Sequence, residues 1–82
     1  MAQRLPMDEL LKMIARNVVD NPDQVEVTAV EGENTNVLEL RVNEADIGKV
    51  IGKGGATIQA LRTILKNAGM RQGKRFILEI IQ

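Results

Sequence analysis

The sequence predicts one α+β domain in which three helices pack on one face of a three-stranded mixed sheet, in the order α-β-β-α-α-β. The chain has 82 residues, too few for two hydrophobic cores, so residues 1–82 are expected to form a single domain. Apolar residues recur with helical spacing in three segments and alternate with polar residues in two others. A long segment separates the second and third predicted strands, which allows them to be parallel neighbours.

The first predicted helix covers residues 6–19. Its apolar residues recur every three or four positions and so share one face: Met7, Leu10, Leu11, Ile14 and Val18. Pro6 suits the first helical position, because its missing N–H group would have no partner there. The turn-forming residues 20–23, Asp-Asn-Pro-Asp, are expected to stop this helix.

Two alternating segments, residues 24–30 and 37–42, predict an antiparallel hairpin joined by the polar residues 31–36. The side chains expected on the buried face are Val25, Val27 and Ala29 in the first strand and Leu38, Leu40 and Val42 in the second. The hairpin therefore supplies an antiparallel pair to the sheet.

A short helix is predicted over residues 44–51, with Asn43 as its N-cap and Gly52 as the residue that ends it. A second helix begins at Ala56 and is expected to end at Gly69. Its apolar face contains Ile58, Leu61, Ile64, Leu65 and Ala68. Residues 75–81 then form a last strand that is apolar on both faces, typical of a strand buried in the sheet centre or in an interface.

The glycine-rich segment 48–55, where these two helices meet, is the most distinctive feature, because it holds four of the seven glycines within eight residues. The first N–H groups of a helix lack internal partners and attract anions. Glycines at positions 52, 54 and 55 let a ligand approach the main chain, Lys53 adds a mobile charge, and Lys49 lies one turn upstream. A plain turn usually needs one glycine, so the excess predicts a phosphate-binding loop.

Nucleotide-enzyme motifs fit this segment poorly. Three residues separate Gly48 from Gly52 where a P-loop has four between its glycines, and Lys53 precedes Gly54. The sequence contains no histidine or cysteine, and Glu44 and Asp46 are the only acids near the loop. We therefore expect no catalytic residues, no metal site and no cofactor.

Charge is distributed unevenly along the chain although the net charge is zero. Residues 1–46 carry ten acids and four bases, whereas residues 47–82 carry one acid and seven bases. This asymmetry predicts a polyanion site in the second half, with a solvated basic face as the alternative. The N-terminus lacks the apolar run of a signal peptide and no segment approaches the ~20 apolar residues of a membrane span, so we expect a cytoplasmic protein without membrane contact.

Residues 50–58, Val-Ile-Gly-Lys-Gly-Gly-Ala-Thr-Ile, resemble the signature of KH domains, in which a Gly-x-x-Gly loop joins two helices. The matching positions are Gly52 and Gly55 for the fixed glycines, Lys53 and Gly54 for the variable pair, and Ile58 for the following apolar position. The element order resembles the type II arrangement of the fold. Over nearly its whole length the chain is similar to the KhpA family of small bacterial single-KH RNA-binding proteins, including the turn that begins at Asp20.

The resemblance implies non-catalytic binding of single-stranded RNA, about four nucleotides long, by a loop that clamps the backbone beside an aliphatic groove. One phenylalanine, without tryptophan or tyrosine, cannot build an aromatic base-stacking sheet. The candidate RNA-binding residues are Gly52, Lys53, Gly54, Gly55, Lys49, Ile47, Ile51, Thr57 and Arg62. For Ile47, Val50 and Ile51 a place in the core is an equal alternative, and Lys66 shares with Arg62 the alternative of a solvated face.

The resemblance also implies partners. It favours an RNA chaperone or post-transcriptional regulator that forms a homodimer, or a heterodimer with a second, KhpB-like KH protein. The alternatives are a protein–protein adaptor on a KH scaffold and a binder of single-stranded DNA.

Overall fold

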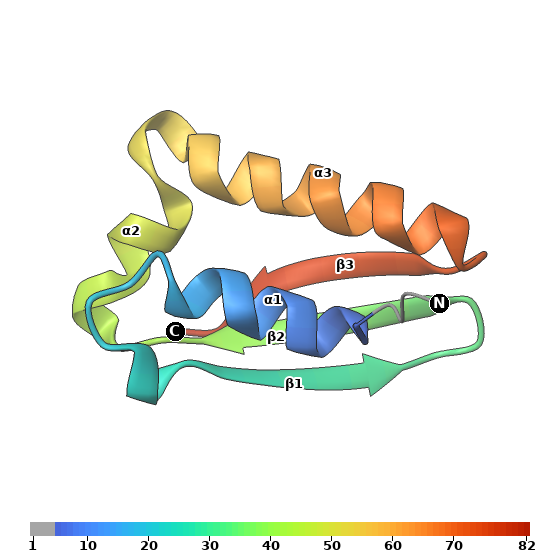
Figure 1. Cartoon of the computed structure of the whole chain (residues 1–82), viewed down its shortest axis with the longest axis horizontal. Coiled ribbons are helices and arrows are strands. Elements are labelled where there is room, and N and C mark those ends of the chain that lie inside the picture. Colours follow the sequence, from blue (N-terminus) through green and yellow to red (C-terminus); the bar gives the residue numbers. More distant parts are fainter. Residues whose placement is uncertain (1–4) are drawn as a thin grey trace.

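The computed structural model of the chain describes residues 5–82 and confirms the predicted order of elements (Figure 1). The helices and strands are α1 (Met7–Arg16), β1 (Glu26–Glu31), β2 (Thr35–Arg41), α2 (Ile47–Ile51), α3 (Ala56–Arg71) and β3 (Arg75–Ile80). Three short 3-10 turns complete the chain: η1 (Pro22–Gln24), η2 (Glu44–Asp46) and η3 (Lys53–Gly55). Residues 1–4, which enter the prediction that a signal peptide is absent, lie outside this range.

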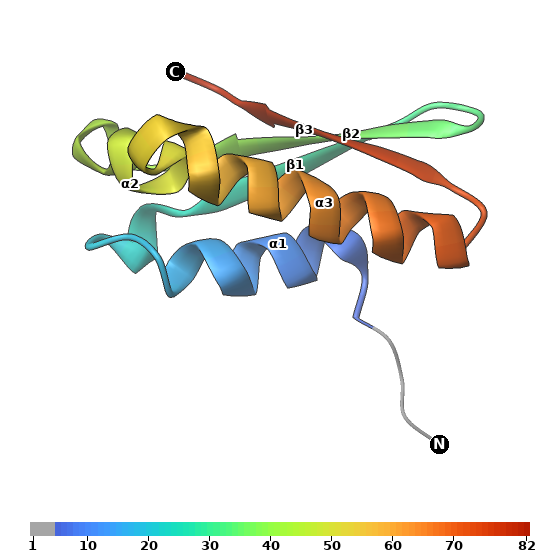
Figure 2. The ribbon, with the colours of Figure 1, turned by 90° about the horizontal axis from the view of Figure 1, so that it is seen from above.

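The three strands form one mixed sheet in the order β1-β2-β3. β1 runs antiparallel to β2, with Val30 opposite Val37, and β2 runs parallel to β3, with Leu38 opposite Leu78. The helices cover one face of this sheet (Figure 2). Within residues 5–82 no helix has the length and apolar character needed to cross a membrane.

β3 lies at an edge of the sheet, which corrects the alternative that the last strand is central. The crossover through α2 and α3 returns the chain beside β2, whose other edge is already paired with β1. The outer edge of β3 therefore has no neighbouring strand in the part of the chain that the structure describes.

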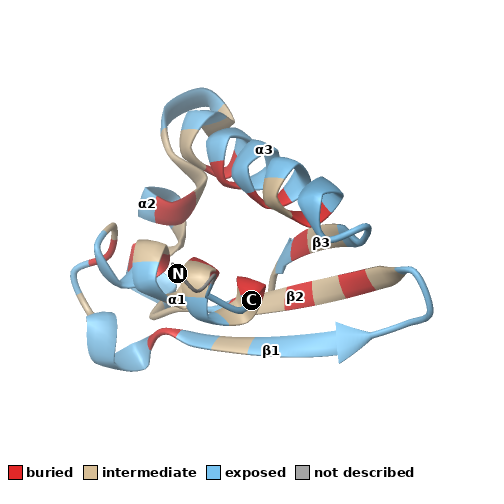
Figure 3. Cartoon of the chain, turned by 45° about the vertical axis from the view of Figure 1, so that its right-hand side comes forward, coloured by how far each residue is buried: buried red, intermediate tan, exposed pale blue. Residues whose placement is uncertain are grey.

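The hydrophobic core lies between the sheet and the helices, and its buried residues follow the inner faces of α3 and β2 (Figure 3). The apolar side chains buried most completely are Leu11, Leu38, Leu40, Val50 and Leu65. Ile64, predicted on the buried face of α3, is 44% exposed. It precedes Leu65 by one residue, about 100° around the helix, which turns it onto the solvent-facing flank.

α1 is shorter than predicted, because it ends at Arg16 instead of continuing to Val19. The Asn17 side chain donates a hydrogen bond to the Met13 carbonyl at 2.7 Å, which satisfies a group that the helix end leaves free. At the other end, Pro6 is the N-cap in extended conformation and not the first helical residue.

The strand boundaries are also displaced by one or two residues. β1 begins at Glu26 because the preceding residues Pro22–Gln24 form a 3-10 turn. β2 begins at Thr35, whose carbonyl accepts a hydrogen bond from the Gly32 N–H group at 2.8 Å. This bond tightens the hairpin turn and extends the pairing beyond the predicted start.

The prediction that Gly69 ends α3 is wrong. The helix passes through Gly69, and Gly73 ends it with a φ of 68°. The Lys74 N–H group donates to the Gly69 carbonyl at 2.9 Å and the Gly73 N–H group donates to the Met70 carbonyl at 3.2 Å, a Schellman motif. Gly69 instead allows α3 to contact β3, since a Cβ atom there would lie 2.7 Å from Phe76 Cδ2.

Candidate nucleic-acid interface

The glycine loop joins α2 to α3 through a compact turn. The Gly52 N–H group donates to the Gly48 carbonyl at 2.8 Å and so closes α2. The Gly55 N–H group donates to the Gly52 carbonyl at 3.0 Å and closes the next turn. Gly52, Gly54 and Gly55 all have positive φ values, of 78°, 64° and 79°. This backbone path explains why three of the four loop residues are glycine.

The glycines differ in what surrounds them. A Cβ atom on Gly52 would lie 2.8 Å from the Thr57 backbone nitrogen and would also collide with the Thr57 side chain. At Gly54 and Gly55 a Cβ atom would meet nothing within 4 Å. The outer part of the loop is therefore open, whereas its first residue packs against the start of α3.

The loop also concentrates positive potential. Gly55 is the N-cap of the 16-residue helix α3 and provides no side-chain cap. The Ala56 N–H group donates to the Lys53 carbonyl, so the N–H groups that follow it in the first turn are the ones left for another acceptor. Lys53 is exposed beside them and has no ion-pair partner within residues 5–82. A helix start with an adjacent free cation favours an anion.

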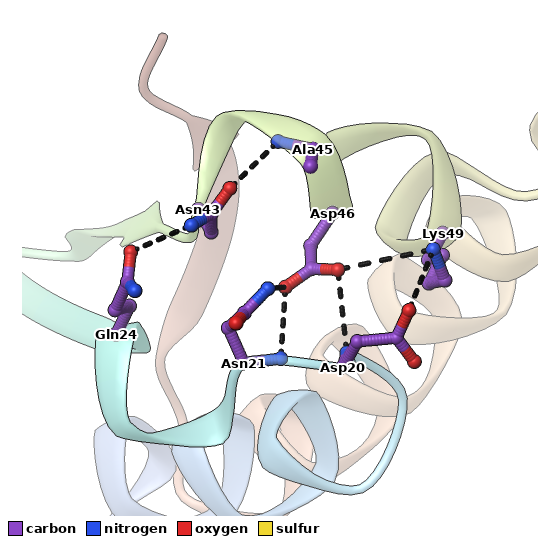
Figure 4. Close-up of polar contacts among 7 residues, drawn as sticks. All are labelled: Asp20, Asn21, Gln24, Asn43, Ala45, Asp46 and Lys49. Carbon is purple, nitrogen blue, oxygen red and sulfur yellow. Dashed lines mark hydrogen bonds and ion pairs between the residues drawn. The ribbon is translucent and has the colours of Figure 1, made fainter.

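Lys49, one turn before the loop, has a different environment (Figure 4). Its ammonium nitrogen lies 3.1 Å from an Asp20 carboxylate oxygen and 3.9 Å from an Asp46 carboxylate oxygen. The sequence placed Lys49 among the phosphate-binding candidates, but its charge already faces two carboxylates. Among the bases of the described chain, Lys49 alone has such an ion pair.

Asp46 is the centre of this contact and is only 1% exposed. Its carboxylate accepts hydrogen bonds from the Asp20 N–H group at 3.3 Å, the Asn21 N–H group at 3.0 Å and the Asn21 side-chain amide at 3.0 Å (Figure 4). We call Asp20, Asn21, Asp46 and Lys49 the clasp. It joins the turn after α1 to the start of α2.

The clasp favours the charged form of Asp46. Burial alone would raise the pKa of this carboxyl group, because it removes water from the carboxylate. The hydrogen bonds from the Asn21 side chain and the Asp20 and Asn21 backbone, together with the Lys49 ammonium, outweigh burial and hold the pKa below its ordinary value.

Asn43 is the predicted N-cap of the segment that leads into α2, and the structure confirms it. The Asn43 side-chain oxygen accepts a hydrogen bond from the Ala45 N–H group at 2.8 Å, and its amide donates to Gln24 at 2.8 Å. Residues 44–51 are nevertheless not one helix, because they divide into the 3-10 turn η2 and the five-residue helix α2.

A second cationic feature lies between α3 and the free edge of β3. A cavity of about 560 Å³ opens there. Its lining combines four bases with an apolar floor: Arg62, Lys66, Lys74 and Arg75, with Met70, Phe76, Ile77 and Leu78. None of these bases has an ion-pair partner within residues 5–82. We call this cavity the basic groove.

The predicted site residues thus fall into separate places. The glycine loop and Thr57 are in contact, and Ile51, which directly precedes the loop, is half-buried. Ile47 is also half-buried, and Val50 belongs to the core with no exposed surface. Arg62 lies in the basic groove, about two helical turns beyond the loop.

Two residues of this region escaped the sequence analysis as candidates. Asp46 could be read only as an acid near the loop, because its partners are 25 and 26 positions away. Gly48 is an exposed glycine inside α2, where an added Cβ atom would meet nothing within 4 Å. Glycine destabilises the interior of a helix, so a glycine inside the predicted helix was the sequence feature that could have marked Gly48 as a candidate.

Comparison with known proteins agrees with this arrangement. The family model described as "KhpA/KhpB, KH domain" matches residues 8–80, which include the loop, the clasp and the basic groove. The chain belongs to the KhpA/KhpB family of KH domains. Its element order and mixed sheet are those of the type II KH fold, as the sequence predicted.

Several relatives of this KH domain cover nearly its whole length. The RNA-binding protein KhpA of Aquifex aeolicus is 50% identical over 76 residues, or 93% of this chain and 96% of the relative. The RNA-binding protein KhpA of Caldanaerobacter subterraneus subsp. tengcongensis is 51% identical over 75 residues, or 92% and 100%. The protein of the same name from Chlamydia trachomatis is 45% identical over 76 residues, or 93% and 97%.

A solved structure shares the KH fold at lower identity. The crystal structure of an Era variant from Aquifex aeolicus bound to GDP·AlF4⁻ matches with a TM-score of 0.62 and 22% identity. The match covers 98% of this chain and 32% of Era, so the chain corresponds to about a third of that protein. At this identity the likeness shows the fold alone.

Proposed function

We propose that this KH domain binds single-stranded RNA by holding the sugar-phosphate backbone against the loop Gly52–Gly55. The observation that carries the proposal is the start of α3, which has no side-chain cap, is reached through an open glycine backbone and is flanked by Lys53, a cation without an ion-pair partner among residues 5–82. Phosphate is one of the anions that a helix start of this kind accepts readily. The relatives from Aquifex aeolicus and Caldanaerobacter subterraneus are RNA-binding proteins by name, which favours RNA as the source of that phosphate.

The basic groove gives the strand a path beyond the loop. Arg62 and Lys66 are four residues apart on α3 and so share one face, which borders the groove. Phe76 and Ile77 supply an apolar floor on β3. A strand of about four nucleotides, held at the loop, would direct its bases toward such a surface. The proposed RNA-binding residues also include Thr57, which contacts the loop, and Ile51, which directly precedes it. Ile47 is included as a half-buried aliphatic neighbour.

The proposal extends to a non-catalytic role in the cytoplasm, as an RNA chaperone or post-transcriptional regulator. One KH domain contacts few nucleotides, so a homodimer or a KhpB-like partner would add contacts and affinity. The family description, which names KhpA and KhpB together, supports a partnership of this kind.

The double variant Lys53→Asp with Gly54→Asp tests the loop directly. It places two carboxylates where the phosphate is expected, and aspartate tolerates the positive φ of residue 54 better than most residues. Fluorescence anisotropy with a short labelled single-stranded RNA should show an affinity loss of roughly tenfold or more, and wild-type affinity should fall with added salt.

The matched control is Arg16→Asp with Asn34→Asp, which changes the net charge equally at exposed positions on α1 and in the hairpin turn. The control should bind RNA within about twofold of wild type. Equal binding by the loop variant and wild type would refute the proposal. Equal affinity for DNA of the same sequence would indicate a general single-strand binder, and absence of any RNA binding would favour the protein adaptor.

A further inference from the structure

The clasp is unusual because a carboxylate with 1% exposure is devoted to a turn 25 and 26 residues earlier in the sequence. A buried carboxylate is tolerated only where its lone pairs are satisfied, and here three N–H groups satisfy them. All three belong to Asp20 and Asn21. The contact thus ties two segments together and is not a local helix cap.

This tie matters for the loop because α2 has only five residues. A helix of that length is not stable by itself and takes its direction from tertiary contacts. In the structure those contacts include Val50, buried in the core, Ile51, packed against the core, and Asp46, at the start of the helix. Gly52 follows at the other end, so the direction of α2 sets the position of the glycine loop.

Lys49 and Lys53 show how the clasp distributes charge. They are four residues apart in the sequence, yet the Lys49 ammonium lies 3.1 Å from Asp20 and 3.9 Å from Asp46, whereas Lys53 has no such partner within residues 5–82. To contact a phosphate, Lys49 would have to give up its ion pairs with two carboxylates. The net contribution of Lys49 to RNA affinity is therefore small compared with that of Lys53.

We propose that Asp46 is a positioning residue of the RNA-binding loop: through the clasp it fixes the direction of α2, and it engages Lys49 as a structural cation and not as a phosphate contact. This inference rests on the proposed function of the loop. It assigns to Asp46 and Lys49 roles that their sequence distance from the glycines does not indicate.

The first test compares Asp46→Asn with wild type in RNA affinity, in the salt dependence of that affinity, and in amide hydrogen exchange at residues 52–55. The variant should bind RNA about fivefold more weakly or worse at every salt concentration, with an unchanged salt slope, and loop amides should exchange faster. An unchanged slope separates positioning from loss of a phosphate contact. Asn21→Ala, which removes only the 3.0 Å side-chain bond, should give a smaller change in the same direction and serves if Asp46→Asn does not fold.

The second test compares Lys49→Gln with Lys53→Gln. Lys53→Gln should reduce the slope of log affinity against log salt by about 0.7, the value for one phosphate contact with a single strand. Lys49→Gln should leave that slope unchanged and alter RNA affinity less than twofold. A slope reduced equally by both variants would overturn the assignment of Lys49.

The two proposals fail separately. The positioning role is overturned if the Asp46→Asn variant binds RNA like wild type and its loop amides exchange hydrogen at the wild-type rate. This holds even if Lys53→Asp with Gly54→Asp abolishes binding. Binding that survives the loop double variant overturns the proposed function itself, whatever the clasp variants do.

Discussion

The two ends of α2 are built in opposite ways. At its start, Asp46 is buried and fully hydrogen-bonded, and it joins the helix to a distant turn. At its end, Gly52–Gly55 turns through positive φ values, with open space beside Gly54 and Gly55. Five helical residues separate a fixed end from an accessible one. Different residues of one short helix can thus fix the position of the loop and keep the loop accessible to a ligand.

This contrast predicts that substitutions at the two ends separate stability from RNA binding. Variants of the clasp should lower the melting temperature, with binding affected through the position of the loop. Variants at the outer loop should change binding with little effect on melting.

The largest effect on stability is expected for Asp46→Ala. Loss of the Asp46 carboxylate leaves the partly buried Asp20 and Asn21 N–H groups without their acceptor, and such unsatisfied donors are costly. The melting temperature should fall by about 5 °C or more in thermal denaturation followed by circular dichroism. Glu44→Ala, at an exposed position of the same 3-10 turn, is the control and should change it little. Equal melting of both variants would contradict the clasp.

Gly52→Ala and Gly54→Ala should differ although both residues have positive φ. At Gly52 the added Cβ atom meets strain and the Thr57 backbone, so we expect a loss of about 2–3 kcal/mol in the free energy of unfolding. At Gly54 the Cβ atom meets no neighbour within 4 Å and only the conformational cost of about 1 kcal/mol remains. Chemical denaturation measures both, and equal losses would show that the packing on Thr57 is unimportant.

The depressed pKa of Asp46 predicts an acid-dependent part of the stability. A group whose pKa is lower in the folded state stabilises the fold above its ordinary pKa of about 3.9 and loses that contribution as pH falls through the folded value. The charged groups that face it are Lys49 and Asp20. Denaturation between pH 2 and 7 should show that the free energy of unfolding of wild type exceeds that of Asp46→Asn by a constant amount above about pH 5. This difference should shrink below about pH 4. A difference independent of pH would contradict this.

The smallest effect concerns Gly48. Gly48→Ala should stabilise the fold by up to about 1 kcal/mol, because alanine favours helix and its Cβ atom meets nothing within 4 Å. The Gly48 carbonyl accepts a hydrogen bond from the Gly52 N–H group, so Gly48 lies next to the loop. We therefore expect RNA affinity to fall about two- to threefold as the surface becomes less accessible. Increased stability with unchanged affinity would limit the site to the loop itself.

Sequence patterns predicted those parts of the molecule whose physical cause is local. The hairpin, the helical faces and the glycine loop follow from alternation, from helical spacing and from the demands of positive φ. The flanking cation Lys53 was predicted for the same reason, and it is exposed.

The features that escaped prediction depend on partners distant in the sequence. Gly69 reads as a helix stop, but its role is contact with Phe76 on β3. The edge position of β3 depends on which side of β2 is already paired. An aspartate near a helix start is normally exposed, and nothing near Asp46 in the sequence reveals that Asn21 will cover it.

The most direct test of the contrast between the two ends is a titration of the ¹⁵N-labelled chain with a short single-stranded RNA, followed by amide chemical shifts. We predict large, salt-sensitive shifts at Lys53, Gly54 and Gly55, and small ones at Asp20 and Asn21. Shifts of equal size in the clasp and in the loop, or shifts confined to the clasp, would contradict the division between a fixed end and an accessible end of α2.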